Sequence, residues 1–179
     1  IYKNTMFKIK IPKNRQRKLR TYALGKKEYE FTNKGSKNLV DLCSNDYFGL
    51  SRDKDVIKAA YETSKSEGLG SGSSRFISGT RPVHESLERE LGEWLGQDRV
   101  LLFPSGFQAN IAAVQALASR DSIVIADKLI HNSLLTGVKA SGAKLIRFLH
   151  NNIKDLEDKV SNFSSKSKSI LVIIESIYS

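Results

Sequence analysis

The sequence is poor in cysteine and proline and has no long apolar run. Its 179 residues include a single cysteine, Cys43, so an internal disulfide and a cysteine-rich metal site are excluded and a reducing compartment is favoured. We expect Cys43 to be a buried apolar residue and predict no metal site. No apolar segment approaches the length of a membrane span, and the first residues lack the apolar core of a signal peptide. These absences favour a cytoplasmic protein with no membrane partner.

Positive charge dominates what is present. Lysine and arginine number 29 against 19 aspartate and glutamate residues, and many of the cations lie between Lys3 and Lys27. Such a charge suits nucleic acid, an anionic surface or a polyanionic cofactor. No nucleic-acid-binding motif accompanies it, and the aromatic residues near the start are not spaced as a stacking platform for bases. We therefore favour a lysine-rich solvated surface with no nucleic-acid partner, and keep a basic nucleic-acid binder as an alternative.

The segment from Val100 to His131 organises the rest of the chain. An apolar run over 100–103 predicts a buried strand, Pro104 to Gly106 break it, and an alanine-rich helix follows through about Leu117. The first amides of a helix lack partners within the helix and lie at the positive end of its dipole. Gly106 and Phe107 are therefore placed to donate hydrogen bonds to a phosphate, although an ordinary strand-to-helix turn would have the same sequence.

After this helix the pattern predicts strands over 122–126, 144–149 and 170–174 and a helix over 152–163. The near-continuous apolar strand 170–174 is typical of a parallel strand that is covered on both faces. Alternating strands and helices favour an α/β fold with a parallel, doubly wound sheet. His131 follows the end of strand 122–126, where such sheets build sites, whereas Lys128 and Lys139 are interpreted as surface lysines.

The part before Val100 has a different character. We expect an arm over 1–37 with a short helix near 15–22, a strand over 38–43, a helix over 53–66 and an amphipathic helix over 82–95. The apolar stripe of the last helix is predicted to be core, and its His84 to be structural. The glycine- and serine-rich stretch 68–75 follows a helix and lacks a Gly-Lys-Ser/Thr ending, so it is not a nucleotide-binding loop.

Six segments of the chain, in order, carry a resemblance to a known family. They are 44–50 (Ser-Asn-Asp-Tyr-Phe-Gly-Leu), 70–80 (the glycine–serine stretch), 84–96, 101–110, 126–134 (with Asp127 and His131) and 175–179 (Glu-Ser-Ile-Tyr-Ser). With these segments the chain resembles the α-oxoamine synthases, pyridoxal-phosphate (PLP) enzymes of fold type I. The match covers most of 41–179.

This resemblance implies a fold and a reaction. The fold would be part of the large domain of the aminotransferase fold type I, incomplete at the C-terminus. Residues 1–40 would form an arm, 41–98 a helical and glycine-loop segment of the substrate and dimer region, and 99–179 the first part of the PLP-binding domain. The sequence Ser105–Asn110 favours the member that condenses L-alanine with pimeloyl-CoA in biotin biosynthesis, because two of its three relatives commonly have a Ser-Cys-Phe pattern there. The relatives glycine C-acetyltransferase, 5-aminolevulinate synthase and serine palmitoyltransferase remain alternatives. The resembled enzymes are homodimers with each site at the subunit interface.

The resemblance also assigns residues. Gly106, Phe107, His131 and Ser179 would hold pyridoxal 5'-phosphate, with the His131 imidazole stacked on the pyridine ring. Arg20, Asn45, Ser74 and His131 would contact the amino acid and acyl-CoA substrates, with Phe76 and Ile77 along the acyl channel. From the residues alone, Arg20 is equally a surface charge, Asn45 a turn residue and Ser74 part of a flexible loop.

No catalytic residue is assigned within this chain. In the resembled family the lysine that forms the Schiff base, and the aspartate that pairs with the pyridine nitrogen, come after the position of Ser179. We therefore expect the full-length protein to be a PLP-dependent acyltransferase and the 179 residues alone to be inactive. A truncated, non-catalytic partner subunit is the alternative.

Overall fold

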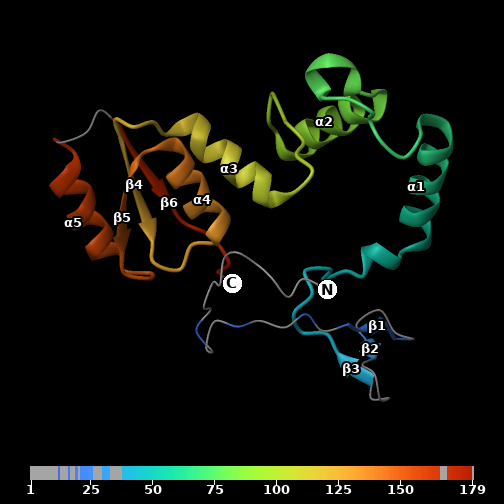
Figure 1. The fold of residues 1–179 in the computed structure, drawn as a ribbon, viewed down its shortest axis with the longest axis horizontal. Coiled ribbons are helices and arrows are strands. Elements are labelled where there is room, and N and C mark those ends of the chain that lie inside the picture. The colour runs from blue at the N-terminus through green and yellow to red at the C-terminus, as the bar shows by residue number, and fades with distance from the viewer. Residues whose placement is uncertain are drawn as a thin grey trace, which may run out of the picture. The chain divides into compact units, whose positions relative to one another are not determined.

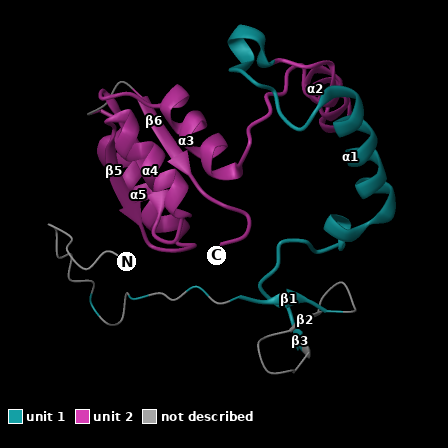
Figure 2. Cartoon of the chain, turned by 45° about the vertical axis from the view of Figure 1, so that its right-hand side comes forward, with its two compact units in different colours: residues 1–79 teal, residues 80–179 magenta. Residues whose placement is uncertain are grey.

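The computed structural model describes residues 12, 16, 19, 21–25, 30–32, 38–165 and 169–178. The chain divides into two compact units, residues 1–79 and residues 80–179 (Figure 2). The boundary falls within the predicted segment 41–98, and the three-part division made from the sequence remains a prediction. The predicted helix near 15–22 lies mostly outside the described residues.

A small antiparallel sheet opens the first unit. It consists of β1 (Ala23–Leu24), β2 (Glu30–Thr32) and β3 (Asn38–Val40) in the order β1-β2-β3, and Phe31 pairs with Leu39. Only the strand that begins at residue 38 was predicted, and it ends at Val40 rather than at residue 43. Cys43, which we expected to be buried, is exposed beyond it, and its amide donates to the Asp41 carboxylate.

Two helical segments and a long helix follow in the first unit. They are η2 (Leu50–Arg52), α1 (Lys54–Glu67) and the single turn η3 (Arg75–Gly79) (Figure 1). The predicted helix is confirmed as α1, and its cap is Asp53, whose carboxylate accepts the amides of residues 55 and 56 at 2.9 and 3.0 Å. No residue of α1 is buried. The helix is therefore defined by its ends rather than by a core.

The second unit holds the predicted parallel sheet. Its strands are β4 (Ser122–Asp127), β5 (Lys144–Phe148) and β6 (Ser169–Ile173), in the order β5-β4-β6. Both neighbours pair with β4 in parallel, and every residue of β4 is buried. The central strand is thus covered on both faces, as its continuous apolar sequence requires.

Helices cover the two faces of this sheet (Figure 1). Val124 and Ala126 pack with α3 (Gly106–Leu117) and α4 (Asn132–Ser141), whereas Ile123 and Ile125 pack with α5 (Ile153–Phe163). The alternation of side chains along β4 sends one set to each face. This arrangement confirms the α/β class and the doubly wound, parallel sheet.

Two predictions for the second unit are wrong. Residues 100–103 form no strand: they pair with no strand of the sheet β5-β4-β6, and the Leu102 amide donates instead to the Glu88 carboxylate at 2.9 Å. The helix α2 (Pro82–Leu95) was predicted correctly, but its apolar stripe is not core: Trp94 is 79% exposed, and Gly92 is the helix's one buried residue. The core of this unit is already filled from α3, α4 and α5.

Helix α4 was not assigned from the sequence, and it packs closely on α3. A Cβ atom on Gly137 would lie 2.9 Å from the Val114 Cβ and 3.3 Å from the Asn110 carbonyl oxygen. Only glycine permits this approach.

Within the described part of the chain, no helix is both long and apolar enough to cross a membrane.

Candidate functional site

The loops that follow the three parallel strands of the second unit lie at one edge of the sheet. β4 ends at Asp127, β5 at Phe148 and β6 at Ile173. His131, His150 and Glu175 follow these ends within a few residues. Because parallel strands end on the same edge, their following loops converge there, and this is where doubly wound sheets place their sites.

The N-terminus of α3 offers free backbone donors. The Ser105 hydroxyl caps the helix by accepting the Gln108 amide at 3.2 Å, and the Ala109 amide begins the helical pattern on the Ser105 carbonyl at 3.1 Å. The amides of Gly106 and Phe107 therefore have no partner inside the helix. The first turn holds no acidic residue, and the space beside Gly106 is open. Such a helix end suits a phosphate.

His131 is the N-cap of α4, and its ring is held by Ser133. Its Nδ1 atom accepts the Ser133 amide at 3.2 Å and lies 2.7 Å from the Ser133 hydroxyl oxygen. That oxygen in turn accepts the side-chain amide of Asn110 on α3 at 2.9 Å. Ser133 is fully buried, whereas His131 is exposed. The histidine that could stack on a ring is thus tied to the helix that could bind a phosphate.

Glu175 holds the backbone of His131 from the neighbouring strand. The His131 amide donates to the Glu175 carboxylate at 2.6 Å, and the Glu175 amide donates to the Tyr178 hydroxyl at 3.3 Å. The first bond joins the loop after β4 to the loop after β6, and the second lies within the loop after β6. The position of His131 is therefore fixed from both its side chain and its main chain.

Asp127 is a buried carboxylate below this loop. It lies 3.0 Å from the Nδ1 atom of His150 and accepts the amides of Leu129 and Asn151 at 2.8 and 3.1 Å. Burial raises the pKa of Asp127, but the two backbone hydrogen bonds and His150 outweigh it, so the pKa lies below its ordinary value. The His150 ring meets the edge of Tyr178 at a centroid distance of 4.6 Å. Asp127 therefore joins the loops after β4 and β5, and His150 reaches Tyr178 in the loop after β6.

The structure brings together only some of the predicted residues. Gly106, Phe107 and His131 lie in the second unit, and Lys128 and Lys139 are exposed as predicted. The predicted substrate residues of the first unit are exposed: Asn45, Ser74, Phe76 and Ile77. Arg20 and Ser179 lie outside the described residues. His84 is structural, because its Nδ1 atom accepts the Arg81 amide at 2.9 Å at the start of α2.

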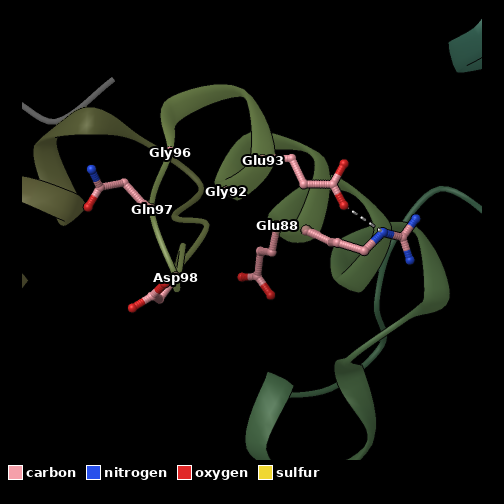
Figure 3. Close-up of a pocket in the computed structure, with 7 residues that line it drawn as sticks. Glu88, Gly92, Glu93, Gly96, Gln97 and Asp98 are labelled. Carbon is pink, nitrogen blue, oxygen red and sulfur yellow. Dashed lines mark ion pairs between the residues drawn. The ribbon is translucent and has the colours of Figure 1, made fainter.

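Two surface cavities lie away from the predicted cofactor residues. One, of about 320 Å³, is lined by the carboxylates of Glu88, Glu93 and Asp98, with Glu93 paired to Arg89 at 4.0 Å (Figure 3). Its acidic wall disfavours a phosphate. The other, of about 680 Å³, includes Lys159, whose ammonium lies 3.4 Å from Asp155.

Across the described residues, no group of three or more potential metal ligands is placed to hold an ion.

Sequence reasoning missed five residues of this site. Asn110 and Ser133 support the His131 ring, and Glu175 holds its backbone. Asp127 and Tyr178 lie in the loops beneath it and contact His150. Four of the five could have been found from their position in the sequence, because each ends or follows a predicted strand of the sheet. Asn110 had a weaker signal, because it lies one turn after Gly106 on the same helix.

Comparison with known proteins shows the family of the chain. Residues 37–179 match the family model for aminotransferase class I and II. The chain is 41% identical over 145 residues to the 8-amino-7-oxononanoate synthase of Anaeromyxobacter sp., which covers 81% of this chain and 36% of that protein. The chain therefore spans little more than a third of the curated relatives that it matches.

Solved structures show the same likeness. A serine palmitoyltransferase from S. paucimobilis, solved with a bound PLP–myriocin aldimine, superimposes with a TM-score of 0.80 at 30% identity, over 87% of this chain and 38% of that one. The 8-amino-7-oxononanoate synthase of Francisella tularensis superimposes with a TM-score of 0.57 at 31% identity, over 65% of this chain and 32% of that one.

Proposed function

The chain belongs to the aminotransferase class I and II family, and from this premise we propose that it supplies part of an 8-amino-7-oxononanoate synthase. That enzyme of biotin biosynthesis would condense L-alanine with pimeloyl-CoA and release carbon dioxide and CoA. The proposal includes a cytoplasmic homodimer. Its main structural support is the link from Asn110 through Ser133 to His131, which joins the helix end that we propose to bind a phosphate to the histidine that we propose to stack on a ring.

Pyridoxal 5'-phosphate is the cofactor of this family, and the residues of the second unit fit it. A phosphate dianion matches the free amides of Gly106 and Phe107 at the positive end of α3. The exposed His131 ring provides a flat face for the pyridine ring. When bound, PLP takes up the electrons released at the amino acid's α carbon, while the protein holds and tunes it.

The chain's own residues would bind and orient rather than react. Gly106 and Phe107 would hold the phosphate and His131 the ring, with Ser179 as a further contact. Glu175 would keep the His131 backbone in place through their 2.6 Å hydrogen bond. Arg20, Asn45 and Ser74 would meet the substrates, with Phe76 and Ile77 along the acyl chain. We propose no catalytic lysine among these residues.

The proposal is tested by CoA release from the full-length protein that contains this chain. We expect PLP-dependent release of CoA from pimeloyl-CoA with L-alanine, followed with a thiol reagent. His131→Asn should lower the rate at least tenfold, as expected for loss of a residue that orients the cofactor. Lys139→Gln, a change at an exposed residue of α4, should leave the rate unchanged. Absence of PLP-dependent release with every pairing of amino acid and acyl-CoA would refute the proposal.

A second candidate is a serine palmitoyltransferase-type enzyme, which would join L-serine to a long-chain acyl-CoA. It is favoured by the structural likeness, because the S. paucimobilis structure superimposes with the higher TM-score and covers more of this chain. The sequence identities to curated relatives favour the first candidate. Rates with L-alanine and pimeloyl-CoA against rates with L-serine and palmitoyl-CoA distinguish the two.

A further inference from the structure

We propose that Asn110 and Ser133 are positioning residues that set the tautomer of His131, so that its neutral imidazole carries the proton on Nε2. The effect of this tautomer on the cofactor rests on the proposed function. The tautomer itself does not, because it follows from hydrogen bonds within the second unit.

The first step is the role of Nδ1. The Ser133 main-chain N–H lies 3.2 Å from the Nδ1 atom of His131. A backbone amide can only donate, so this contact favours a lone pair on Nδ1. In a neutral imidazole the proton then resides on Nε2. The Ser133 hydroxyl, 2.7 Å from the same nitrogen, completes the arrangement when it also donates.

The second step is the direction of the hydroxyl hydrogen. The side-chain NH₂ group of Asn110 donates to the Ser133 oxygen at 2.9 Å. This donor occupies one of the two lone pairs of the oxygen, and the hydroxyl hydrogen can point to Nδ1, whose lone pair already faces the Ser133 amide. Ser133 is fully buried, so water does not compete for these bonds. Asn110 and the Ser133 amide therefore favour the same direction of the relay, and the Ser133 hydroxyl transmits the contribution of Asn110.

The third step concerns the helix that supplies Asn110. It lies four residues after Gly106 in α3, and residues at this spacing share a face of a helix. The same helix thus offers amides to a phosphate and sets the proton of the stacking histidine. A neutral imidazole places no positive charge against the cofactor's ring, and its Nε2–H remains as the one ring donor for an acceptor such as a substrate carboxylate.

The tautomer is measured by ¹⁵N NMR of the histidine rings, with the His131 signals identified by their loss in His131→Asn. We expect an unprotonated Nδ1 and a protonated Nε2 in the unaltered protein at a pH where the ring is neutral. Asn110→Asp replaces the donor by a carboxylate that accepts the Ser133 hydroxyl hydrogen. The Ser133 oxygen can then accept from Nδ1–H, so this variant should raise the Nδ1–H population at least severalfold.

Two further variants keep the test decisive. Gln115→Glu makes the same amide-to-acid change at an exposed residue of α3 and should leave the His131 spectrum unchanged. Ser133→Ala removes the hydroxyl but keeps the backbone donor, so Nδ1 should stay unprotonated. When Asn110→Asp is added to Ser133→Ala, the second change should have no further effect on the His131 tautomer. A protonated Nδ1 in the unaltered protein, or identical spectra for Asn110→Asp and Gln115→Glu in folded proteins, would overturn the proposal.

The link to the cofactor is measured separately as the dissociation constant of PLP. Asn110→Asp should weaken binding about tenfold relative to Gln115→Glu, the size expected from one misplaced hydrogen bond. If the tautomer responds but the unaltered protein binds no PLP, the proposed function fails and the tautomer relay stands. If PLP binds equally to both variants, the relay has no role toward the cofactor.

Discussion

The two units of the chain differ in what holds them together. In the second unit β4 is wholly buried, with Val124, Ile125 and Ala126 at 0% exposure. Among the described residues of the first unit only Gly79 is buried. The residues that we propose to hold the cofactor and that the structure describes lie in the unit with a core. The proposed substrate residues that it describes lie in the unit without one.

This difference has a physical reason. A cofactor must be held within a fraction of an ångström, which requires side chains locked by packing and by hydrogen bonds such as those of Ser133. Helix α1 has no such packing, since Val56, Ile57 and Tyr61 are 48, 53 and 62% exposed. Most helical stability in proteins comes from tertiary contacts, so we expect the first unit to be the less stable.

The largest expected effect contrasts one isoleucine in each unit. Ile125→Ala removes a fully buried side chain from β4 and should lower the free energy of unfolding by about 2–5 kcal/mol. Ile57→Ala, in α1, should change it by less than about 0.5 kcal/mol. Urea unfolding followed by circular dichroism measures both. An equal decrease in the free energy of unfolding for both variants would show that Ile57 is packed as tightly as Ile125, and would contradict the comparison.

The contact between α3 and α4 is the next test of the second unit. Gly137→Ala places a methyl group 2.9 Å from the Val114 Cβ and should cost about 1–3 kcal/mol through overpacking. Gly106→Ala points into open space and should leave stability within about 0.5 kcal/mol. Its methyl group should instead weaken PLP binding. Thermal unfolding together with a PLP titration separates the two glycines, and a stable Gly137→Ala variant would contradict the close approach.

Asp127 makes the second unit sensitive to acid. Its pKa in the folded state lies below the unfolded value of about 4, so its contribution is present above that pH and is lost as the pH falls through the folded pKa. Asp127→Asn should cost about 1–3 kcal/mol at pH 7, because buried donors lose their partner. In this variant the urea concentration at half unfolding should also fall less steeply as the pH is lowered toward 3. Asp55→Asn, at an exposed position of α1, is the control and should leave this decline unchanged.

The smallest expected effects come from the helix caps. Ser105→Ala removes the cap of α3 and should cost about 1 kcal/mol. Asp53→Ala removes the cap of α1 by the same mechanism. Hydrogen exchange resolved by mass spectrometry should show faster exchange in α1 for Asp53→Ala with no change in β4. For Ser105→Ala, exchange should rise in β4 as well, because α3 belongs to its core. A rise in β4 in both variants would mean that the units unfold together.

Local sequence was enough to predict the elements with clear ends or strict periodicity. Asp53 and Gly68 bound α1, Ser105 begins α3, and the apolar runs of β4 and β6 are those of buried parallel strands. The run 100–103 is also apolar but forms no strand, because a strand requires a partner and this run pairs with no strand of the sheet β5-β4-β6. The apolar stripe of α2 was predicted to be buried for a related reason. Its periodicity shows that one face is apolar, but the core of the unit is formed by the sheet with α3, α4 and α5.

By itself, the sequence determined the α/β class, the parallel strands and the position of His131 after one of them. The six matching segments also placed the chain in its family. Only the tertiary structure decided what holds His131. Ser133 is a near neighbour of His131 in sequence, whereas Asn110 comes from α3 and Glu175 is 44 residues away. Glu175 reaches His131 because parallel strands end on one edge of the sheet, and Asn110 reaches Ser133 because α3 packs on α4. Residue periodicity encodes which face of an element is buried. Which polar side chains converge is decided by how the elements pack.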